Sequence, residues 1–364
     1  MNEIIYLDHA ATTPICDAAK KAIIKHLDDF GNPSSTYELG RKSRVLIEDA
    51  RERIAKCINA EPDEIYFTSG GSEANTWALN QFDVISSNIE HHSINTEYCF
   101  PVKNDGIVNL NECWGIDYWI TDLVSCMYVN NELGTIQPIR DIAQITHNSG
   151  KWFHVDAVQA TPYLKIDVKD LNCDMLSASG HKFGATKGIG FLYVNNEFKK
   201  FDYIKPLIHG GKQESGLRGG TENILGIVSM AAALEDAIEH MEERNAYVKH
   251  LRDKLLGKLL QIPGSHLNGS LKNRVPGNIN IRFDGVSGAK LVTLCNLYGI
   301  CISSGSACNE GISEPSHVLK AIGLTDEEAL SSIRVTLGHE NTEEEIDYAT
   351  DIIIKLVERI RDEE

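Results

Sequence analysis

The stretch LVSCMYVNNELGTIQPIRDIAQITHNSGKWFHVDAVQ, residues 123–159, decides the class of fold. It begins with an apolar run at 123–129, continues with a helical pattern at 139–148 and ends in a second apolar run at 152–155. Short apolar runs bounded by turn residues predict buried strands, and a helix between two such runs predicts that the strands are parallel. We therefore expect a strand–helix–strand unit here.

The same alternation continues on both sides of this unit. Further strand-like runs lie at 64–68, 84–87, 175–178 and 190–194. Further helical patterns lie at 43–58 and 73–78. This alternation predicts an α/β fold in which helices wrap a mostly parallel sheet. Ligands of such sheets bind at the carboxyl ends of the strands, where loops meet helix N-termini.

The last third of the chain has a different pattern. A long helical pattern runs from residue 222 to about 261, and it resembles a connecting helix that leaves a large domain. Shorter strand-like runs follow at 277–283, 300–303 and 332–337, and a helix is expected after Thr342. We expect a large domain over 12–245 and a smaller α+β domain formed by 1–11 and 246–364.

Composition and charge exclude several classes of protein. The chain has 364 residues with a formal net charge of −17, which disfavours a nucleic-acid or anionic-membrane partner. Its nine cysteines include no C-x-x-C pair, so free thiols in a reducing compartment are favoured over disulfides or a zinc site. The sequence shows neither a secretory signal nor a long apolar stretch, and we expect a soluble cytoplasmic protein.

The segment SASGHKFGATKGIG, residues 177–190, offers a lysine beside groups that can bind phosphate. Enzymes that use pyridoxal 5'-phosphate (PLP) need a lysine amine that reacts with the cofactor and neighbours that hold its phosphate. Lys182 follows a strand-like run and has Ser179 and His181 close by, whereas the competing Lys187 has no imidazole beside it. The alternative interpretation is a solvated loop lysine.

An acid follows the apolar run at 152–155. Asp156 could pair with the pyridine nitrogen of PLP, which would keep the ring an electron sink, and Gln159 could hydrogen-bond its phenolic oxygen. The spacing from Asp156 to Lys182 leaves room for one more strand, so both would lie at one edge of the sheet. The alternative is that Asp156 caps a helix.

Three further segments carry weaker signals. Gly71 and Ser72, in IYFTSGGSEANTWAL, stand at a strand-to-helix turn of the kind that binds anions. His91 and His92 end the segment SSNIEHHSI, and only one should face a site because strand side chains alternate. Asn130, in YVNNELG, offers a neutral hydrogen-bond donor. Each of these residues could equally have a structural role.

The segment ISSGSACNEGISEPSHVLKAIG, residues 302–323, places Cys308 in a Gly/Ser-rich loop before a helix expected to begin near Glu314. A cysteine in such a loop should be mobile and accessible, whereas most cysteines are buried and inert. Arg334, on the expected strand at 332–337, could grip a substrate carboxylate through two hydrogen bonds. The alternatives are an incidental loop thiol and a surface salt bridge.

Taken together, nine segments resemble the cysteine desulfurases of the nitrogen-fixation and iron–sulfur-assembly type, within the class V aminotransferases. They are YLDHAATTP (6–14), FGNPSS (30–35), FTSGGSEAN (67–75), NNELG (130–134), HVDAVQ (154–159), SGHKFGATKGIG (179–190), RGGTEN (218–223), SSGSAC (303–308) and SSIRVTLG (331–338). The resemblance implies a homodimeric fold-type-I PLP enzyme with a seven-stranded, mostly parallel sheet. It also implies conversion of L-cysteine to L-alanine, with the sulfur left on the enzyme as a persulfide.

The resemblance assigns roles by motif position. Lys182 matches the lysine that binds the cofactor, and Asp156 and Gln159 match the contacts to the ring nitrogen and phenolic oxygen. His91, rather than His92, matches the catalytic histidine that stacks on the ring. Gly71, Ser72, Ser179 and His181 match the residues that bind the phosphate, and Asn130 matches an asparagine that contacts cofactor and substrate. Thr221 matches a threonine that reaches the neighbouring subunit's phosphate. Arg334 matches the arginine that binds the substrate carboxylate, and Cys308 matches the persulfide cysteine.

The sulfur acceptor stays open. The SSGSAC loop resembles a long-loop subgroup that hands sulfur directly to partners, so we expect an acceptor protein, either a scaffold or a thiotransferase. Cys308 could also ligate a transferred cluster. Residues 80–127 look shorter than in relatives, Tyr37 stands where relatives usually have His, and Glu310 should make the nearby thiol less reactive. Transamination, a β-lyase reaction, a selenocysteine substrate and a non-catalytic module are the competing interpretations.

Overall fold

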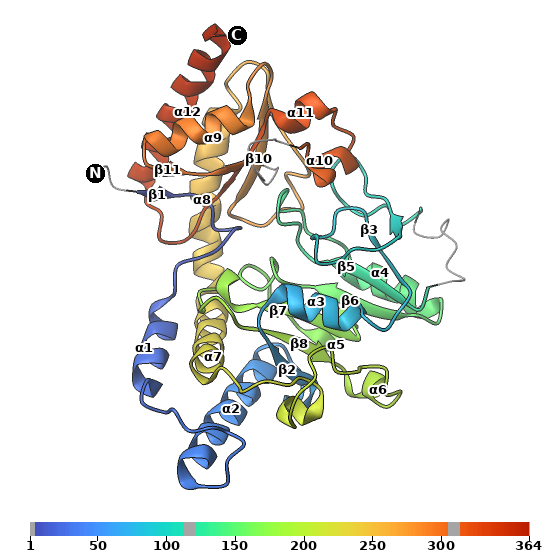
Figure 1. Cartoon of the computed structure of the whole chain (residues 1–364). Helices are drawn as coiled ribbons and strands as arrows, with labels where there is room; N and C mark the ends of the chain where they lie inside the picture. Colours follow the sequence, from blue (N-terminus) through green and yellow to red (C-terminus); the bar gives the residue numbers. More distant parts are fainter. Residues whose placement is uncertain (1–3, 113–120, 305–313, 364) are drawn as a thin grey trace.

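The computed structural model describes residues 4–112, 121–304 and 314–363. Within these residues a seven-stranded sheet forms the centre of the larger part of the molecule, and a four-stranded sheet forms the centre of the smaller part. A long helix, α8 (Met241–Leu259), runs from one part to the other (Figure 1). The predicted α/β fold with a seven-stranded, mostly parallel sheet is confirmed.

The large sheet has the strand order β2-β8-β7-β6-β5-β3-β4. Its strands are β2 (Ile65–Thr68), β3 (Val84–Ser87), β4 (Tyr98–Phe100), β5 (Leu123–Met127), β6 (Trp152–Asp156), β7 (Met175–Ser179) and β8 (Gly190–Val194). Only β8 among these runs antiparallel to its neighbours, so β2 points the same way as β7. The carboxyl ends of β2, β6 and β7 therefore meet at one edge of the sheet.

Helices cover this sheet, which explains why its central strands are apolar throughout. Every residue of β5 and β7 is buried. The amphipathic helix α4 (Ile139–Asn148) buries its apolar residues at three- and four-residue spacing against the sheet. The other helices of the larger part are α1 (Asp17–His26), α2 (Glu38–Cys57), α3 (Gly71–Leu79), α5 (Val168–Leu171), α6 (Asn196–Lys199) and α7 (Ile224–Glu239).

The smaller part has a separate apolar core. Its antiparallel sheet has the order β12-β13-β10-β9, from β9 (Ser265–Leu267), β10 (Asn278–Phe283), β12 (Ser303–Ser304) and β13 (Ser332–Thr336). The N-terminal strand β1 (Ile5–Tyr6) pairs with β11 (Ile300–Cys301) and packs into the same core. The helices here are α9 (Gly288–Leu297), α10 (His317–Ala321), α11 (Asp326–Leu330) and α12 (Glu343–Glu363). The exact domain boundaries stay a prediction.

Two expected helices differ in the structure. The long pattern at 222–261 forms two helices, α7 and α8, which meet at His240. The helix expected near Glu314 begins at His317, because the Ser316 side chain caps the first turn by accepting from the backbone N–H of Val318. No helix among the described residues has the length and apolar character needed to cross a bilayer.

Candidate active site

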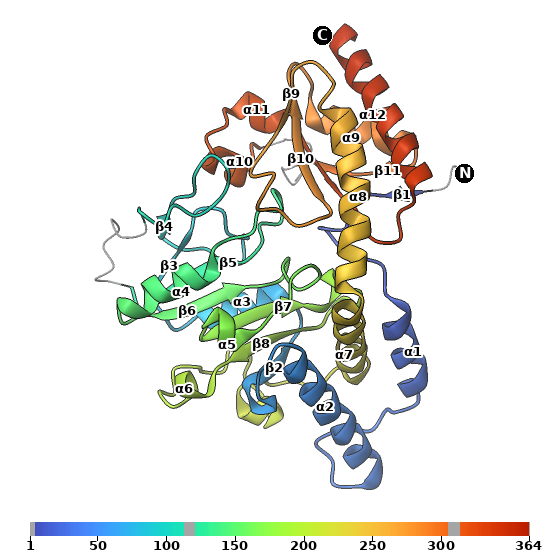
Figure 2. The ribbon, with the colours of Figure 1, turned by 180° about the vertical axis from the view of Figure 1, so that it is seen from behind.

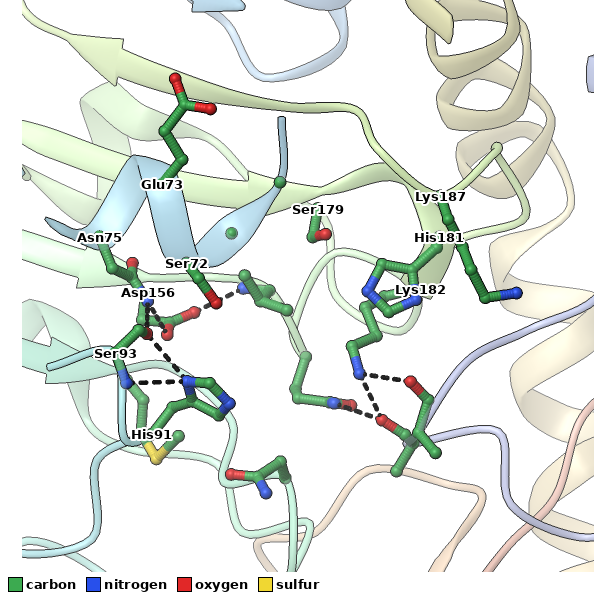
Figure 3. Close-up of a pocket in the computed structure, with 18 of the residues that line it drawn as sticks. Ser72, Glu73, Asn75, His91, Ser93, Asp156, Ser179, His181, Lys182 and Lys187 are labelled. Carbon is green, nitrogen blue, oxygen red and sulfur yellow. Dashed lines mark hydrogen bonds between the residues drawn. The ribbon is translucent and has the colours of Figure 1, made fainter. Parts of the chain in front are cut away.

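The carboxyl ends of β2, β6 and β7 open into a cavity of about 530 Å³, a volume typical of small-molecule sites. The cavity brings together residues from distant segments of the sequence (Figure 3). The predicted residues in its wall are Gly71, Ser72, His91, Asp156, Gln159, Ser179, His181, Lys182 and Arg334. From the sequence, only Asp156 and Lys182 were predicted to meet, because the spacing between them placed both at one edge of the sheet.

Lys182 lies in a short 3₁₀ turn directly after β7. Its Nζ donates to the backbone oxygens of Ala10 at 2.7 Å and Ala11 at 2.8 Å. Burial, and then the positive charge of Arg334, lower the pKa of Lys182 to about 8. The neutral, nucleophilic amine is therefore far more abundant than in an ordinary lysine. This placement speaks against a solvated loop lysine.

Asp156 ends β6 and is buried at the floor of the cavity. Its Oδ1 accepts from the Val158 backbone N–H at 2.9 Å, and its Oδ2 accepts from Asn75 Nδ2 at 2.7 Å. Burial raises the pKa of Asp156, and these two donors counter the rise. A cation placed in the cavity would favour the ionised form further. Asp156 does not cap an α-helix, since none begins in the described residues directly after it.

His91 faces the cavity, whereas His92 turns toward another surface. His91 Nδ1 lies 2.8 Å from Ser93 Oγ and accepts from the Ser93 backbone N–H at 3.1 Å. Burial lowers the pKa of His91, so its neutral form predominates near neutral pH. His92 packs against His317, with 4.9 Å between ring centroids, and does not line the cavity. The structure thus places His91, and not His92, in the cavity wall, and the ring-stacking role of His91 stays a prediction.

The first turn of α3 forms one end of the cavity. A Cβ atom at Gly71 would lie 2.6 Å from Val158 Cγ2, so only glycine lets the chain pass this close. Its neighbour Ser72 and the side chain of Ser179 line the same end. Helix N-termini favour anions through their free N–H groups and dipole. This end is therefore suited to a phosphate.

His181 lies beside the same end of the cavity. Its Nδ1 is 3.1 Å from Thr12 Oγ1. Burial, together with the positive charges of Lys182 and Lys187, lowers the pKa of His181 to about 4. The ring is consequently neutral and can act as a hydrogen-bond donor toward an anion.

Arg334 lies on β13, across the cavity from the large sheet. Its Nη2 pairs with Asp8 Oδ1 at 2.8 Å, and its Nη1 donates to the Asn131 backbone oxygen at 3.0 Å. Its side chain is only 10% exposed, so it is not a surface salt bridge. Its buried Nε has no partner among the described residues, which leaves donor capacity for a carboxylate.

Gln159 and Lys182 share an acceptor. Gln159 Nε2 donates to the Ala10 backbone oxygen at 2.8 Å, and this oxygen also accepts from the lysine amine. The amide group of Gln159 is thus held beside the Lys182 amine.

Two predicted residues lie outside the cavity wall. Asn130 Oδ1 accepts from the backbone N–H groups of Glu132 at 3.0 Å and Leu133 at 2.8 Å, so the side chain closes a turn. Its neighbour Asn131 lines the cavity, and the expected contact of Asn130 with cofactor and substrate stays a prediction. Thr221 is exposed and lines a separate hollow with Gly188. It makes no contribution to this chain's own cavity.

Cys308 lies outside the described residues, but both ends of its segment are placed. Ser303, in β12, pairs with Arg334 in β13. On the other side, Ser316 Oγ donates to Glu132 Oε2 at 2.6 Å. Glu132 directly follows Asn131, whose carbonyl accepts from the Arg334 guanidinium. The chain therefore leaves and re-enters the described structure close to the same arginine.

The sequence argument missed two buried residues, Asn75 in the cavity wall and Glu90 outside it. Asn75 holds the Asp156 carboxylate, and its position one helical turn after Gly71 was a usable signal, because residues four apart share a helix face. Glu90 accepts from the Met127 backbone N–H at 2.9 Å and from the Ser87 hydroxyl. Burial raises the pKa of Glu90 to about 8, so it is mostly protonated at neutral pH. No pattern in the sequence indicated this.

Comparison with known proteins agrees with this geometry. Residues 5–349 match the family described as aminotransferase class V. The chain is 41% identical to "Cysteine desulfurase IscS" of Methanosarcina thermophila over 382 residues, covering 99% of this chain and 93% of that protein. It superposes on a solved "NifS-like protein" with a TM-score of 0.90 at 34% identity, covering 98% of this chain and 100% of that one. A structure titled "SspA in complex with cysteine" gives a TM-score of 0.79 at 34% identity, covering 93% and 100%. The chain belongs to the class V aminotransferase family, among the IscS and NifS-like cysteine desulfurases.

Proposed function

We propose that this chain uses PLP held by Lys182 to take the sulfur from L-cysteine, and that Cys308 carries this sulfur to an acceptor protein. The observation that carries the proposal is the half-buried Lys182 amine, with a pKa of about 8, in one cavity with the Asp156 carboxylate. The two groups lie at the ends of neighbouring strands and suit a cofactor that has both a carbonyl and a ring nitrogen. The amine would bind the carbonyl, and the carboxylate would pair with the ring nitrogen.

The residues of the cavity fit PLP. The first turn of α3, with Gly71 and Ser72, would hold the phosphate, helped by Ser179 and His181. Asp156 would pair with the ring nitrogen, and His91 would stack on the ring face. Gln159 would contact the phenolic oxygen, and Lys182 would bind the carbonyl carbon. When bound there, PLP supplies an electron sink for negative charge on the substrate's α-carbon.

Arg334 would bind the substrate carboxylate. In the structure its guanidinium holds Asp8, so a carboxylate already occupies one of its donor positions. The Nε, which has no partner among the described residues, would add a donor for a second carboxylate. One solved relative is described as a complex with cysteine, which supports cysteine as the substrate.

Cys308 would take the sulfur. It is four residues beyond Ser304 in the sequence, and four extended residues span at most about 14 Å. Because β12 pairs with β13 at Arg334, this reach starts beside the proposed substrate carboxylate. The covalent structure therefore permits the thiol of Cys308 and the amine of Lys182 to act on one amino acid.

The sulfur step balances without an added oxidant. The Cys308 thiolate attacks the substrate sulfur, and a new S–S bond forms as the substrate C–S bond breaks. The electron pair of the broken bond stays with the substrate carbon, which takes up a proton to give L-alanine. Lys182 Nζ and His91 would move protons, and the lowered pKa of each, which leaves more of the neutral form, supports this role. The persulfide on Cys308 then passes its outer sulfur to an acceptor thiol.

We further infer that the active unit is a homodimer. Helices α1 and α2 project beyond the rest of the larger part, as Figures 1 and 2 both show. They and the turn between them carry apolar side chains that are 49% to 79% exposed: Ile24, Leu27, Phe30, Tyr37, Leu39 and Val45. Such an exposed apolar patch is typical of a protein interface. A second copy would also bring Thr221 to a neighbouring cavity.

The test is release of alanine and sulfide from L-cysteine in the presence of a reducing thiol. We expect Lys182→Ala and Cys308→Ala both to abolish sulfide release, and only Lys182→Ala to lose the absorbance of covalently bound PLP. Alanine formation by Cys308→Ala at the wild-type rate would contradict the proposed role of the thiol. A wild-type protein that stays colourless with added PLP would instead favour a non-catalytic module.

A further inference from the structure

Hydrogen bonds join Asp156 and His91 through two further residues of the cavity wall, Asn75 and Ser93. Asn75 Nδ2 donates to Asp156 Oδ2 at 2.7 Å and to Ser93 Oγ at 2.9 Å. Ser93 Oγ in turn lies 2.8 Å from His91 Nδ1. All four residues line the cavity, and Figure 3 shows them together on the side opposite Lys182. We call the pair Asn75 and Ser93 the amide link.

Donor chemistry fixes the direction of these bonds. The amide nitrogen of Asn75 has two hydrogens and no acceptor, so both the Asp156 carboxylate and the Ser93 oxygen must accept. Turning the amide round would put its oxygen against the carboxylate, where two acceptors would repel. Because His91 Nδ1 already accepts from the Ser93 backbone N–H, it carries no hydrogen, and the Ser93 hydroxyl donates its own hydrogen to it.

The link therefore determines where His91 carries its hydrogen. Nδ1 accepts from the Ser93 hydroxyl and also from the Ser93 backbone N–H at 3.1 Å. A neutral imidazole whose Nδ1 accepts must carry its hydrogen on Nε2. Figure 3 shows the other ring nitrogen pointing away from Ser93, toward the open part of the cavity. At the opposite end of the link, Asp156 receives a charge-assisted hydrogen bond that favours its ionised form.

We propose that Asn75 and Ser93 are positioning residues that hold Asp156 as a carboxylate and His91 with its hydrogen on Nε2 through one continuous set of hydrogen bonds. The inference rests on the proposed function, in which these two groups contact the PLP ring. One set of hydrogen bonds would thus account for both the ionised form of Asp156 and the position of the hydrogen on His91. The ring nitrogen of PLP would then face the negatively charged Asp156, and the Nε2–H of His91 would point into the cavity.

The direction of the link is tested in PLP-free protein by ¹⁵N NMR of the histidine side chains, with His91 assigned by its absence in His91→Gln. We expect the Nε2–H form in the wild type. Removing the hydroxyl donor in Ser93→Ala should raise the pKa of His91, whereas Ser93→Thr, which keeps the hydroxyl, should restore the wild-type titration. The other groups that act on this ring stay unchanged in these variants: Asp156, Lys182, His92 and His317.

The Asp156 end is tested by PLP affinity. Asn75→Asp keeps the shape but puts an acceptor against Asp156, so we expect PLP to bind at least about tenfold more weakly. The matched control is Asn80→Asp, the same change at the exposed end of α3, which should bind PLP like the wild type.

Three outcomes would overturn the inference: the Nδ1–H form in the wild type, an unchanged His91 titration in Ser93→Ala, or unchanged PLP affinity in Asn75→Asp. Failure of the wild type to bind PLP would overturn the proposed function instead. The histidine measurement separates the two cases, because it uses protein without PLP.

Discussion

The two walls of the cavity are built in different ways. The cofactor wall, formed by Asp156, His91 and Lys182, comes from loops and strand ends of the large sheet, and desolvation shifts the pKa of each of these groups from its ordinary value. The substrate wall centres on Arg334 of the small sheet, and its contacts run to Asp8 and Asn131 in other segments. The comparison indicates that cofactor binding is built into one sheet, while the substrate and sulfur groups are brought to it from elsewhere. A substitution in one wall should therefore weaken the binding of cofactor or of substrate without abolishing the binding of the other.

The largest effect is expected on the cofactor wall. Asp156→Asn keeps the shape of the side chain but removes the charge that would pair with the ring nitrogen. Loss of one partner of a buried charge pair costs about 3 to 5 kcal/mol, so PLP should bind at least about a hundredfold more weakly. Titration of PLP-free protein with PLP measures this change. Affinity within threefold of the wild type would show that Asp156 is not the ring partner.

A smaller and more selective effect is expected on the substrate wall. Arg334→Ala should lower kcat/KM for L-cysteine about tenfold to a hundredfold, because a charged hydrogen-bonded group is lost. PLP affinity should stay near the wild-type value. The control is Arg359→Ala, which removes an exposed arginine of α12. If Arg334→Ala loses PLP and cysteine binding together, the walls are not independent.

The pH dependence sharpens the comparison, because one charge acts across the cavity. Reaction of PLP with Lys182 needs the neutral amine, so its rate should rise with pH through about 8 and then level off. An ordinary lysine would keep rising toward about 10.4. Arg334→Ala removes a cation that lowers the pKa of Lys182, so the midpoint should move to higher pH. Stopped-flow absorbance of PLP-free protein mixed with PLP gives both midpoints.

A midpoint near that of an ordinary lysine in the wild type would contradict the burial of this amine. An unchanged midpoint in Arg334→Ala would show that the two walls do not interact electrostatically.

The smallest effect is expected at the returning end of the Cys308 segment. Ser316→Ala removes a helix cap and the hydrogen bond to Glu132, and Thr325→Ala removes the comparable cap of α11. Both should cost about 1 kcal/mol in the free energy of unfolding, measured by denaturant titration. Only Ser316→Ala should also slow persulfide formation, by about fivefold. Equal persulfide rates in the two variants would remove any role for the Glu132 contact.

The sequence predicted the sheet because its strands are apolar throughout, which helices on both faces require. It predicted the meeting of Asp156 and Lys182 because both follow strands that end at one edge. Asn75 and Glu90 escaped prediction, since their roles depend on contacts with residues far along the chain. The sequence did not show that Asn130 closes a turn while Asn131 lines the cavity, because neighbouring asparagines cannot be told apart until that turn is known.

The most direct test of the account is mass spectrometry of the protein after brief exposure to L-cysteine without a reducing thiol. The account predicts one extra sulfur atom on the peptide that contains Cys308 in the wild type, and none in Lys182→Ala. It would be contradicted by sulfur on Cys308 in Lys182→Ala. It would equally be contradicted if the wild-type sulfur were found on another cysteine, such as the exposed Cys99.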